Sequence, residues 1–433
     1  MTTQDLFVTP IYIILFSLIA YLIRPFATTP YTRQYFMPAL WVKFFGAILL
    51  GLLYQFYYGG GDTINYFNYG SRWIWEAFLV DFEQGISLLL DSGGNNRDPE
   101  TFSFNSKIWY YRDPKSYAIV RITAVFDLFT FHTYSATSLF FATFSFSGLW
   151  ALFSKIVTRY PYVKPRNIAI SILFVPSVIF WGSGILKDTI TLGALGWLIW
   201  ALMNLIEKRF AIKYLIVLCI AAILILGIKS YILLACIPAV IIWVSVKYSN
   251  RIHGKLKLVA TPLILAITVG FGFLILRSIS SINSEYTLEN FSRRAAITAY
   301  DIRYGWGARG GGEGGYDIGL PDGSVQSLVR LIPAGVNVSI FRPYIWEVRN
   351  PLMLLSALES LVITILFLAT LYKRNLRMIT KDPFLSFCLV FSLIFAFAVG
   401  VSSFNFGTLI RYKIPMTPFL FLFLFIGQYS RKS

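Results

Sequence analysis

Two apolar segments joined by a short basic one decide the fold: SATSLFFATFSFSGLWALFS at 135–154, KIVTRYPYVKPR at 155–166 and NIAISILFVPSVIFWGS at 167–183. Each apolar segment has a length within the roughly 17 to 25 residues that a transmembrane helix needs. The segment between them contains Lys and Arg but no Asp or Glu, and short basic loops of this kind usually lie on the cytoplasmic side. The pattern predicts two membrane-spanning helices joined by an inner loop.

The composition extends this prediction to the whole chain. Of 433 residues, 56% are hydrophobic and only 14% are charged, which is more apolar surface than a soluble protein can bury. We therefore expect an all-α, polytopic integral membrane protein. The net charge of +17 would suggest nucleic acid in a soluble domain, but much of it lies in short segments between apolar stretches, where Lys and Arg act as topology signals. We expect no nucleic-acid partner.

Apolar stretches of membrane-spanning length recur along the chain, and we expect about eleven transmembrane helices. The expected spans are 7–24, 38–58, 135–154, 167–183, 189–206, 211–228, 231–247, 257–277, 350–372, 383–401 and 411–428. A twelfth stretch, 117–131, is short for a span and carries Arg121 and Asp127, which are costly inside a bilayer.

Short basic segments orient these spans. They are 25–43, 155–166, 207–213, 247–257, 373–382 and the C-terminal RKS. All six can be cytoplasmic only if an even number of crossings separates the first from the second. The spans 38–58 and 135–154 already supply two crossings, so we expect 113–131 to be re-entrant or to lie in the membrane interface. The N-terminal MTTQDLFVTP lacks the basic region of a signal peptide, so we expect the first span to be retained. This topology puts the N-terminus outside and the C-terminus inside.

The chain then divides into three parts. Residues 1–277 hold the N-terminal membrane helices with the outer segment 59–134, residues 278–349 form a long outer loop, and residues 350–433 hold the C-terminal membrane helices. Within the loop, GWGARGGGEGGYDIGLPDGS at 305–324 has too many glycines for a packed element and indicates a mobile or ligand-wrapping loop. It contains no phosphate-binding fingerprint of the P-loop or dinucleotide type.

The first candidate site is YYGGGDTINYFNYGSRWIW at 57–75, at the outer end of the second span. One interpretation is a loop followed by a helix that is capped by Asp62 or Thr63. The other is that Asp62 acts as a general base toward a sugar hydroxyl, with Tyr66 and Trp73, together with Trp75, offering flat surfaces to sugar rings.

The second candidate site is FVPSVIFWGSGILKDTITLG at 174–193. Its proline and glycines indicate either a tight turn with a solvated charge pair or an interrupted helix whose freed backbone groups face a cavity. In the second case Lys187 would point at an anionic phosphate beside Asp188. Nearby, Lys229 in GIKSY either extends to the interface or binds a ligand.

Two further groups of charges lie at outer ends of the C-terminal spans. Arg342, Glu347 and Arg349 precede one span, and Arg411 and Lys413 begin the last. Both groups fit an interfacial collar of charged residues, and both fit contacts to phosphate, which arginine binds with two parallel hydrogen bonds.

Metal and disulfide chemistry have little support in the sequence. The three cysteines lie inside apolar stretches without CxxC spacing, and neither His132 nor His253 has a partner at metal-ligand spacing. We expect no metal and no cofactor.

The motifs GGGDTINYF, PSVIFWGSGILKD, IFRPYIWEVRNPLMLLSALE and FNFGTLIRYKIP occur in an order that resembles the Wzy/EpsG-type polysaccharide repeat-unit polymerases. More distantly, the chain is similar to the GT-C class of lipid-carrier-dependent glycosyltransferases. The resemblance extends over nearly the whole chain. One departure is that the acidic pair near the first outer loop of many GT-C enzymes is here the single Asp62.

The resemblance implies a membrane glycosyltransferase of the bacterial inner membrane that works in exopolysaccharide or O-antigen synthesis. It would transfer saccharide from a polyprenyl-pyrophosphate carrier to a growing glycan on the periplasmic side. Asp62 would deprotonate the attacking hydroxyl, and Lys187 with Arg342 or Arg411 would stabilise the departing pyrophosphate.

Two other classes of function stay open. One is a transporter or flippase for a lipid-linked or anionic substrate, in which the interrupted helix around Gly182 and Gly184 is a gate. The other is a non-catalytic membrane scaffold that docks other envelope-assembly proteins.

Overall fold

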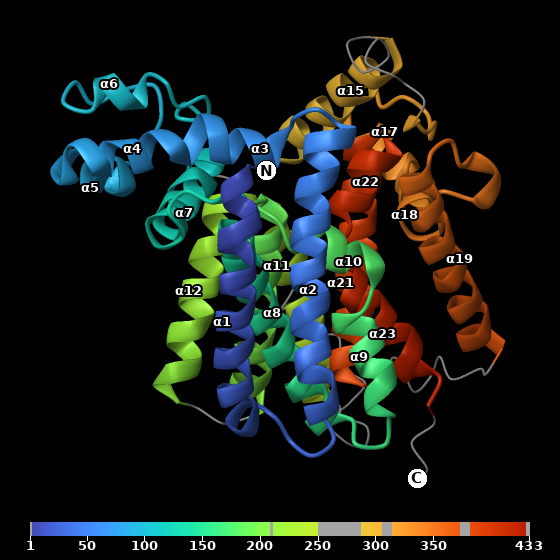
Figure 1. The fold of residues 1–433 in the computed structure, drawn as a ribbon. Helices are drawn as coiled ribbons and strands as arrows, with labels where there is room; N and C mark the ends of the chain where they lie inside the picture. Colours follow the sequence, from blue (N-terminus) through green and yellow to red (C-terminus); the bar gives the residue numbers. More distant parts are fainter. Residues whose placement is uncertain (1, 208–210, 250–286, 305–313, 373–381, 430–433) are drawn as a thin grey trace. The chain divides into compact units, whose positions relative to one another are not determined.

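The computed structural model describes residues 2–207, 211–249, 287–304, 314–372 and 382–429. In these ranges the regular secondary structure is helical, and one isolated β-bridge joins Gly315 and Asn405 (Figure 1). Several of the helices are long and apolar enough to cross a bilayer. The protein is therefore an all-α, polytopic membrane protein, as the composition predicts.

Within the described ranges, eight helices meet the length and hydropathy expected of a span. They are α1 (Thr3–Ala27), α2 (Arg33–Leu52) with its π-helical extension η1 (Leu53–Tyr57), α8 (Tyr134–Arg159), α11 (Lys187–Ile206), α12 (Ile212–Lys229), α13 (Tyr231–Ser249), α19 (Pro351–Tyr372) and α21 (Pro383–Ser403). The pair α22 (Phe406–Tyr412) and α23 (Thr417–Gly427), bent by 71°, would make a ninth.

The described residues do not support a count of eleven. The expected span 257–277 lies outside them. The expected span 167–183 is interrupted, because α9 (Pro165–Leu173) ends before Val175 and α10 (Pro176–Trp181) is only six residues long. Proline at the first position of α10 explains the interruption, since it cannot donate a backbone hydrogen bond and disfavours helix in the residue before it.

Two compact units make up the chain. Unit 1 comprises 1–161 and 173–230, and unit 2 comprises 162–172 and 231–433. The three-part division expected from hydropathy stays a prediction.

Unit 1 is a bundle in which α8 packs against α1, α2 and α11, and α11 also packs against α12 (Figure 1). Glycines permit the close approach of α8 and α11: a Cβ at Gly148 would lie 1.9 Å from the Gly193 carbonyl oxygen, and one at Gly196 would lie 2.4 Å from the Gly148 oxygen. Small residues at such contacts are a common means of helix association in membranes, because they bring the two backbones together.

Short helices cover one end of this bundle. They are α3 (Asp62–Tyr66), the π-helix η2 (Phe67–Ser71), α4 (Arg72–Val80), α5 (Phe82–Leu90), α6 (Phe102–Asn105) and α7 (Pro114–Thr130). Their shared core includes Tyr117, Ile119 and Val120 of α7. The stretch 113–131 is thus a helix capped by Asp113, which accepts from the Lys115 amide, and it is not among the candidate spans. Its re-entrant or interfacial position stays a prediction.

Unit 2 is organised around α21, which packs against α13, α18 (Ile332–Phe341) and α23. Phenylalanines at a helical spacing on α21, including Phe384, Phe387 and Phe391, are fully buried. The remaining elements of the unit are α9, α15 (Leu288–Tyr304), α17 (Val325–Arg330), the 3₁₀-helix η5 (Ile345–Glu347), α19 and α22.

The α8–α11 contact should be intolerant of added volume. We expect Gly148→Ala to lower the free energy of unfolding of detergent-solubilised protein by about 1–3 kcal/mol, because the new methyl group would collide with backbone atoms. The control is Gly227→Ala in α12, where a Cβ meets nothing within 4 Å and alanine favours the helix. Unfolding by SDS in mixed micelles would measure both, and equal stability of the two variants would contradict the contact.

Candidate functional site

Four charged side chains meet where α11 begins in unit 1. Lys187 is the first residue of α11, and its Nζ lies 3.4 Å from Oδ2 of Asp113. Asp188 follows, fully buried, and its Oδ1 accepts from Nζ of Lys229 at 2.5 Å. The sequence predicts Lys187 and Asp188 as site residues, and the structure adds Asp113 and Lys229 as their partners.

The two ion pairs differ in exposure. The side chains of Asp188 and Lys229 are 0% and 7% exposed, whereas those of Lys187 and Asp113 are 18% and 50% exposed. A buried pair is costly to separate, because each charge would lose its compensation. A long, half-exposed pair is weak and can exchange partners. Of the two lysines, Lys187 is therefore the one that a ligand can reach.

Asp113 lies in the segment 59–134, just before α7, and its carboxylate is held in the charged form. Burial alone would raise its pKa, but hydrogen bonding from Ser116 and the charge of Lys187 outweigh burial and lower the pKa of Asp113.

Asp62 belongs to the same electrostatic neighbourhood, since its charge acts on Lys187. It follows Gly59, Gly60 and Gly61, all with positive φ (65°, 145° and 127°), a conformation that glycine adopts without strain. Gly61 is the cap and Asp62 is the first residue of α3. The interpretation of Asp62 or Thr63 as the helix cap is therefore wrong.

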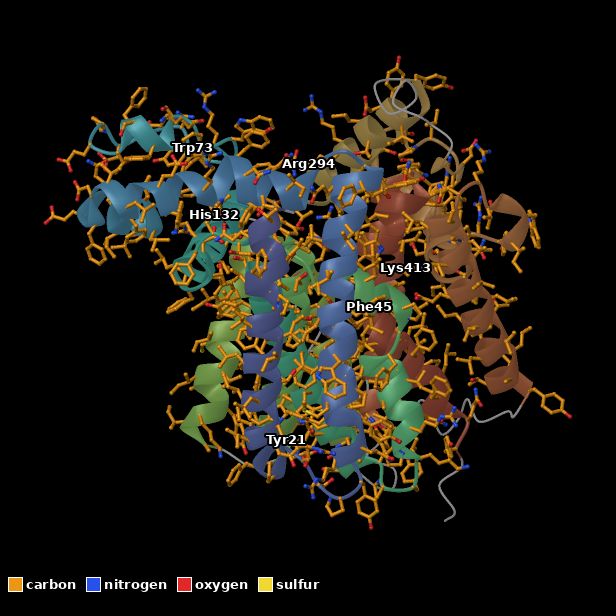
Figure 2. All side chains as sticks on the ribbon, viewed as in Figure 1. Tyr21, Phe45, Trp73, His132, Arg294 and Lys413 are labelled. Atoms are coloured by element: carbon orange, nitrogen blue, oxygen red, sulfur yellow. The ribbon has the colours of Figure 1, made fainter. Side chains whose placement is uncertain are left out.

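The aromatic residues predicted to offer sugar platforms contact protein groups. The ring of Tyr66 is 2% exposed and packs against Tyr110 at 4.8 Å. Trp73 carries Lys107 Nζ over its ring at 4.6 Å, and Figure 2 labels it among the short helices. The sugar-stacking role of Tyr66 and Trp73 stays a prediction.

The sequence pattern predicts that Lys43 lies in a basic loop at 25–43. The structure corrects this, because Lys43 lies within α2 and is 2% exposed. Its Nζ donates to the carbonyl oxygens of Val178 at 3.0 Å and Gly182 at 2.7 Å, and to the Ser145 hydroxyl at 3.2 Å. The ammonium group thus satisfies carbonyls that the short helix α10 leaves free.

His132 is a second residue for which the sequence predicts no role. Its Nδ1 lies 2.9 Å from Oδ2 of Asp127, which is fully buried. A weak signal for this pair was present, because the two residues lie five apart around the end of a helix.

The predicted C-terminal site residues lie in unit 2. Arg342 contacts both carboxylate oxygens of Glu347 through Nε, at 3.0 Å each, and pairs with it through Nη2 as well. Glu347 Oε2 also accepts from the Tyr344 amide at 2.8 Å. The guanidinium lies over the ring of Phe406 at 5.4 Å. The structure brings Arg342 and Glu347 together, while Arg349 is exposed.

Lys413 is 1% exposed and donates to the Ser339 carbonyl at 3.3 Å (labelled in Figure 2). The charge of Glu359, another buried residue, acts on it. Arg411, two residues before, is half-buried. These residues belong to unit 2, whereas Asp62, Lys187 and Asp188 belong to unit 1.

Part of the glycine-rich stretch is anchored in unit 2. Residues 305–313 lie outside the described ranges, but Tyr316 donates its hydroxyl to the Gly400 carbonyl at 2.7 Å and accepts from the Phe404 amide at 3.0 Å. The prediction of a ligand-wrapping loop is untested for the first part of the stretch, and the part that ends at Ser324 is fixed to the end of α21.

Metal-binding potential can be judged only for the described residues. Among them, no three His, Cys, Asp or Glu side chains gather in a way that could hold a metal ion.

The chain matches no protein-family model, no curated protein and no solved structure.

The carbonyl contacts of Lys43 should be important for stability. Lys43→Met keeps the side-chain length but leaves the Val178 and Gly182 carbonyls without their partner, so we expect a loss of about 2–4 kcal/mol in the free energy of unfolding. Lys213→Met at the start of α12, where the lysine is exposed, is the matched control. The measurement is SDS unfolding in mixed micelles. A loss no larger than that of the control would remove Lys43 from this role.

The Arg342–Glu347 pair should make stability depend on pH. Burial opposes the charge of Glu347, but the hydrogen bonds from Arg342 and the Tyr344 amide lower its pKa. The pair therefore contributes fully above the unfolded pKa, about 4.3, and its contribution is lost as pH falls through the lower folded pKa. Between pH 7 and pH 3.5, wild type should lose up to about 1 kcal/mol more stability than Glu347→Gln. Parallel thermal unfolding curves would reveal this, and identical pH dependence would count against it.

Proposed function

We propose that this protein is a polysaccharide polymerase of the bacterial inner membrane, a glycosyltransferase that uses a polyprenyl-pyrophosphate-linked saccharide as donor. The observation that carries the proposal is the Lys187–Asp113 pair where α11 begins, together with Asp62, whose charge acts on Lys187. A carboxylate and a reachable cation side by side are the groups that glycosyl transfer from a pyrophosphate donor needs.

The donor's pyrophosphate fits the beginning of α11. The first amides of this 20-residue helix carry partial positive charge and favour anions. Lys187 adds a full charge, and its contact with Asp113 at 3.4 Å is weak enough for a phosphate oxygen to replace it. The buried Asp188–Lys229 pair keeps α11 and α12 together beneath this position.

A polyprenyl tail needs an apolar surface beside the phosphate position. The helix α12 ends at Lys229 and exposes Ile216, Ile220 and Ile223. Side chains of this kind on a spanning helix contact lipid tails, and the carrier's prenyl chain has the same chemistry. The tail would therefore lie along α12 while the pyrophosphate reaches Lys187.

The proposed reaction uses Asp62 as the base. Asp62 would accept the proton of an acceptor hydroxyl, whose oxygen forms a bond to the anomeric carbon of the donor sugar. The bond between that carbon and the pyrophosphate oxygen breaks, and polyprenyl pyrophosphate leaves with the electron pair while Lys187 balances its charge. Arg342 and Arg411 are not required by this scheme, because unit 1 alone supplies the base and the cation.

The periplasmic position of the proposed site is inferred from the Lys and Arg residues of the short segments between helices. The basic segment 155–166 includes the C-terminal end of α8, and 207–213 joins the C-terminal end of α11 to the beginning of α12. Short basic segments favour a cytoplasmic location for these helix ends. The proposed site lies at the other end of α11. The proposed site would then face the periplasm, with the N-terminus outside and the C-terminus inside.

Reconstitution distinguishes this function from the other classes. Purified protein in liposomes would be given an undecaprenyl-pyrophosphate-linked oligosaccharide, and product length would be followed on gels. Chain extension supports the polymerase. Movement of the lipid-linked oligosaccharide between leaflets without extension would identify a transporter, and neither activity would favour a scaffold.

Within this assay, Asp62→Asn should abolish chain extension, with a loss of at least about 100-fold, because the amide cannot accept the hydroxyl proton. Insertion into the membrane should be unchanged. Glu100→Gln, at an exposed carboxylate of the same outer segment, is the matched control and should extend chains normally. Normal chain lengths from Asp62→Asn would exclude Asp62 as the base.

A further inference from the structure

Unit 1 contains a pocket that the proposed reaction scheme does not use. Its volume is ≈ 460 Å³, within the usual range for small-molecule sites. It lies beside the glycine turn before α3, because Gly59 and Gly60 line it together with Gln55, Asn68 and His132. The amide and imidazole groups make it a polar pocket at the same end of the unit as Asp62.

A buried carboxylate fixes the position of His132. Asp127 accepts from the hydroxyls of Ser71 at 2.6 Å and Thr137 at 2.7 Å, and its Oδ2 lies 2.9 Å from His132 Nδ1. These donors come from three different segments, so Asp127 is held on all sides. A buried, acceptor-only carboxylate favours the tautomer in which Nδ1 carries the proton. Nε2 is then left as a hydrogen-bond acceptor.

The imidazole ring is held between two aromatic rings. It stacks on Phe67 at 3.9 Å with an interplanar angle of 0°, and it lies 5.3 Å from Trp75 at 19°. Phe67 and Trp75 are eight residues apart on continuous helix, which separates them by roughly 10 Å along the axis, so they cover opposite faces of the imidazole. His132 can therefore line the pocket only with an edge, and Nδ1 is already occupied by Asp127.

The backbone at this point is strained. Phe131 and His132 both have positive φ, 53° and 52°, a conformation that costs non-glycine residues roughly 1–2 kcal/mol each. The Gln4 side chain holds the turn by donating to the Phe131 carbonyl at 2.9 Å. Strain of this kind persists where the surrounding structure enforces a position, and it often accompanies binding sites.

The charges around the pocket are largely balanced. Asp5 accepts from the amides of Thr2 and Ser135, and Arg72 is paired with Glu76 at 2.7 Å. Arg72 is the cation among these lining groups, and a phosphate would have to displace Glu76 from it. Amides, an imidazole acceptor and backbone glycines instead match a ligand with many hydroxyls, each of which donates and accepts.

We propose that this pocket is a saccharide-binding subsite in which His132, oriented by Asp127, accepts a hydrogen bond from a sugar hydroxyl while Asn68 and Gln55 bind neighbouring hydroxyls. The proposal rests on the proposed function, because the occupant is the end of the growing acceptor glycan. His132 is a binding residue in this scheme, and Asp127 is a positioning residue.

The experiment measures binding without turnover. Full-length protein in detergent would be screened against free oligosaccharides of two to six hexose or hexosamine units, with inorganic phosphate as a competing probe. The fluorescence of Trp75, next to His132, offers a readout, and calorimetry gives the affinity. We expect an oligosaccharide to bind and phosphate not to compete.

Two variants test the residues independently. His132→Phe keeps an aromatic ring between Phe67 and Trp75 but removes Nε2. Asn68→Ala changes an exposed side chain and spares the buried network if the first variant does not fold. Each should weaken oligosaccharide binding by about tenfold, and Glu100→Gln should leave it unchanged. No binding by the wild type, or unchanged affinity in the folded variants, would overturn the subsite.

The outcomes also separate this proposal from the polymerase. Chain extension without measurable oligosaccharide binding would overturn the subsite and leave the polymerase standing. Oligosaccharide binding that both variants weaken, without chain extension or release of the carrier, would support the subsite and overturn the polymerase.

Discussion

The structure of unit 1 depends on how the backbone carbonyls of α10 are satisfied where this helix ends among buried residues. Lipid offers no hydrogen-bond partner, so carbonyls freed at a break must find one in the protein. Here the ammonium of Lys43, carried by α2, reaches the carbonyls of Val178 and Gly182. The α10 break can exist because α2 supplies this cation, and the break allows the chain to begin a new helix at Lys187.

Most of the long helices could be predicted from the sequence, because apolar length acts locally, but the break before α10 lies inside the expected span 167–183. The long helices α1, α8, α12 and α21 lie close to the expected ranges, and Pro176 with Gly182 marks the break around α10. Lys43 could not be predicted. A charge near the end of an apolar run suggests a loop, and only the fold shows that α10 ends beside it.

The sequence predicts part of the candidate site, but it gives no sign of Asp113 or of the pairings. Glycines before Asp62 and charges between two spans single out Asp62, Lys187 and Asp188. The partner of Asp188 is Lys229, 41 residues away, and no local pattern contains that information. The pair of Asp127 and His132 was missed for a related reason, since each residue taken alone is explained by an ordinary helix end.

The close contact of α8 with α11 sets the relative depth of the two proposed binding positions. Gly148 lies about four turns into α8, whereas Gly193 lies in the second turn of α11, and the two helices run in the same direction through this contact. At about 1.5 Å per residue, α11 begins roughly 10 Å further into the bundle than α8 does. Lys187 therefore sits at a deeper level than Tyr134, which lines the pocket beside His132. Such a step suits an amphiphile whose phosphates rest among the lipid headgroups while its sugars extend into water above them.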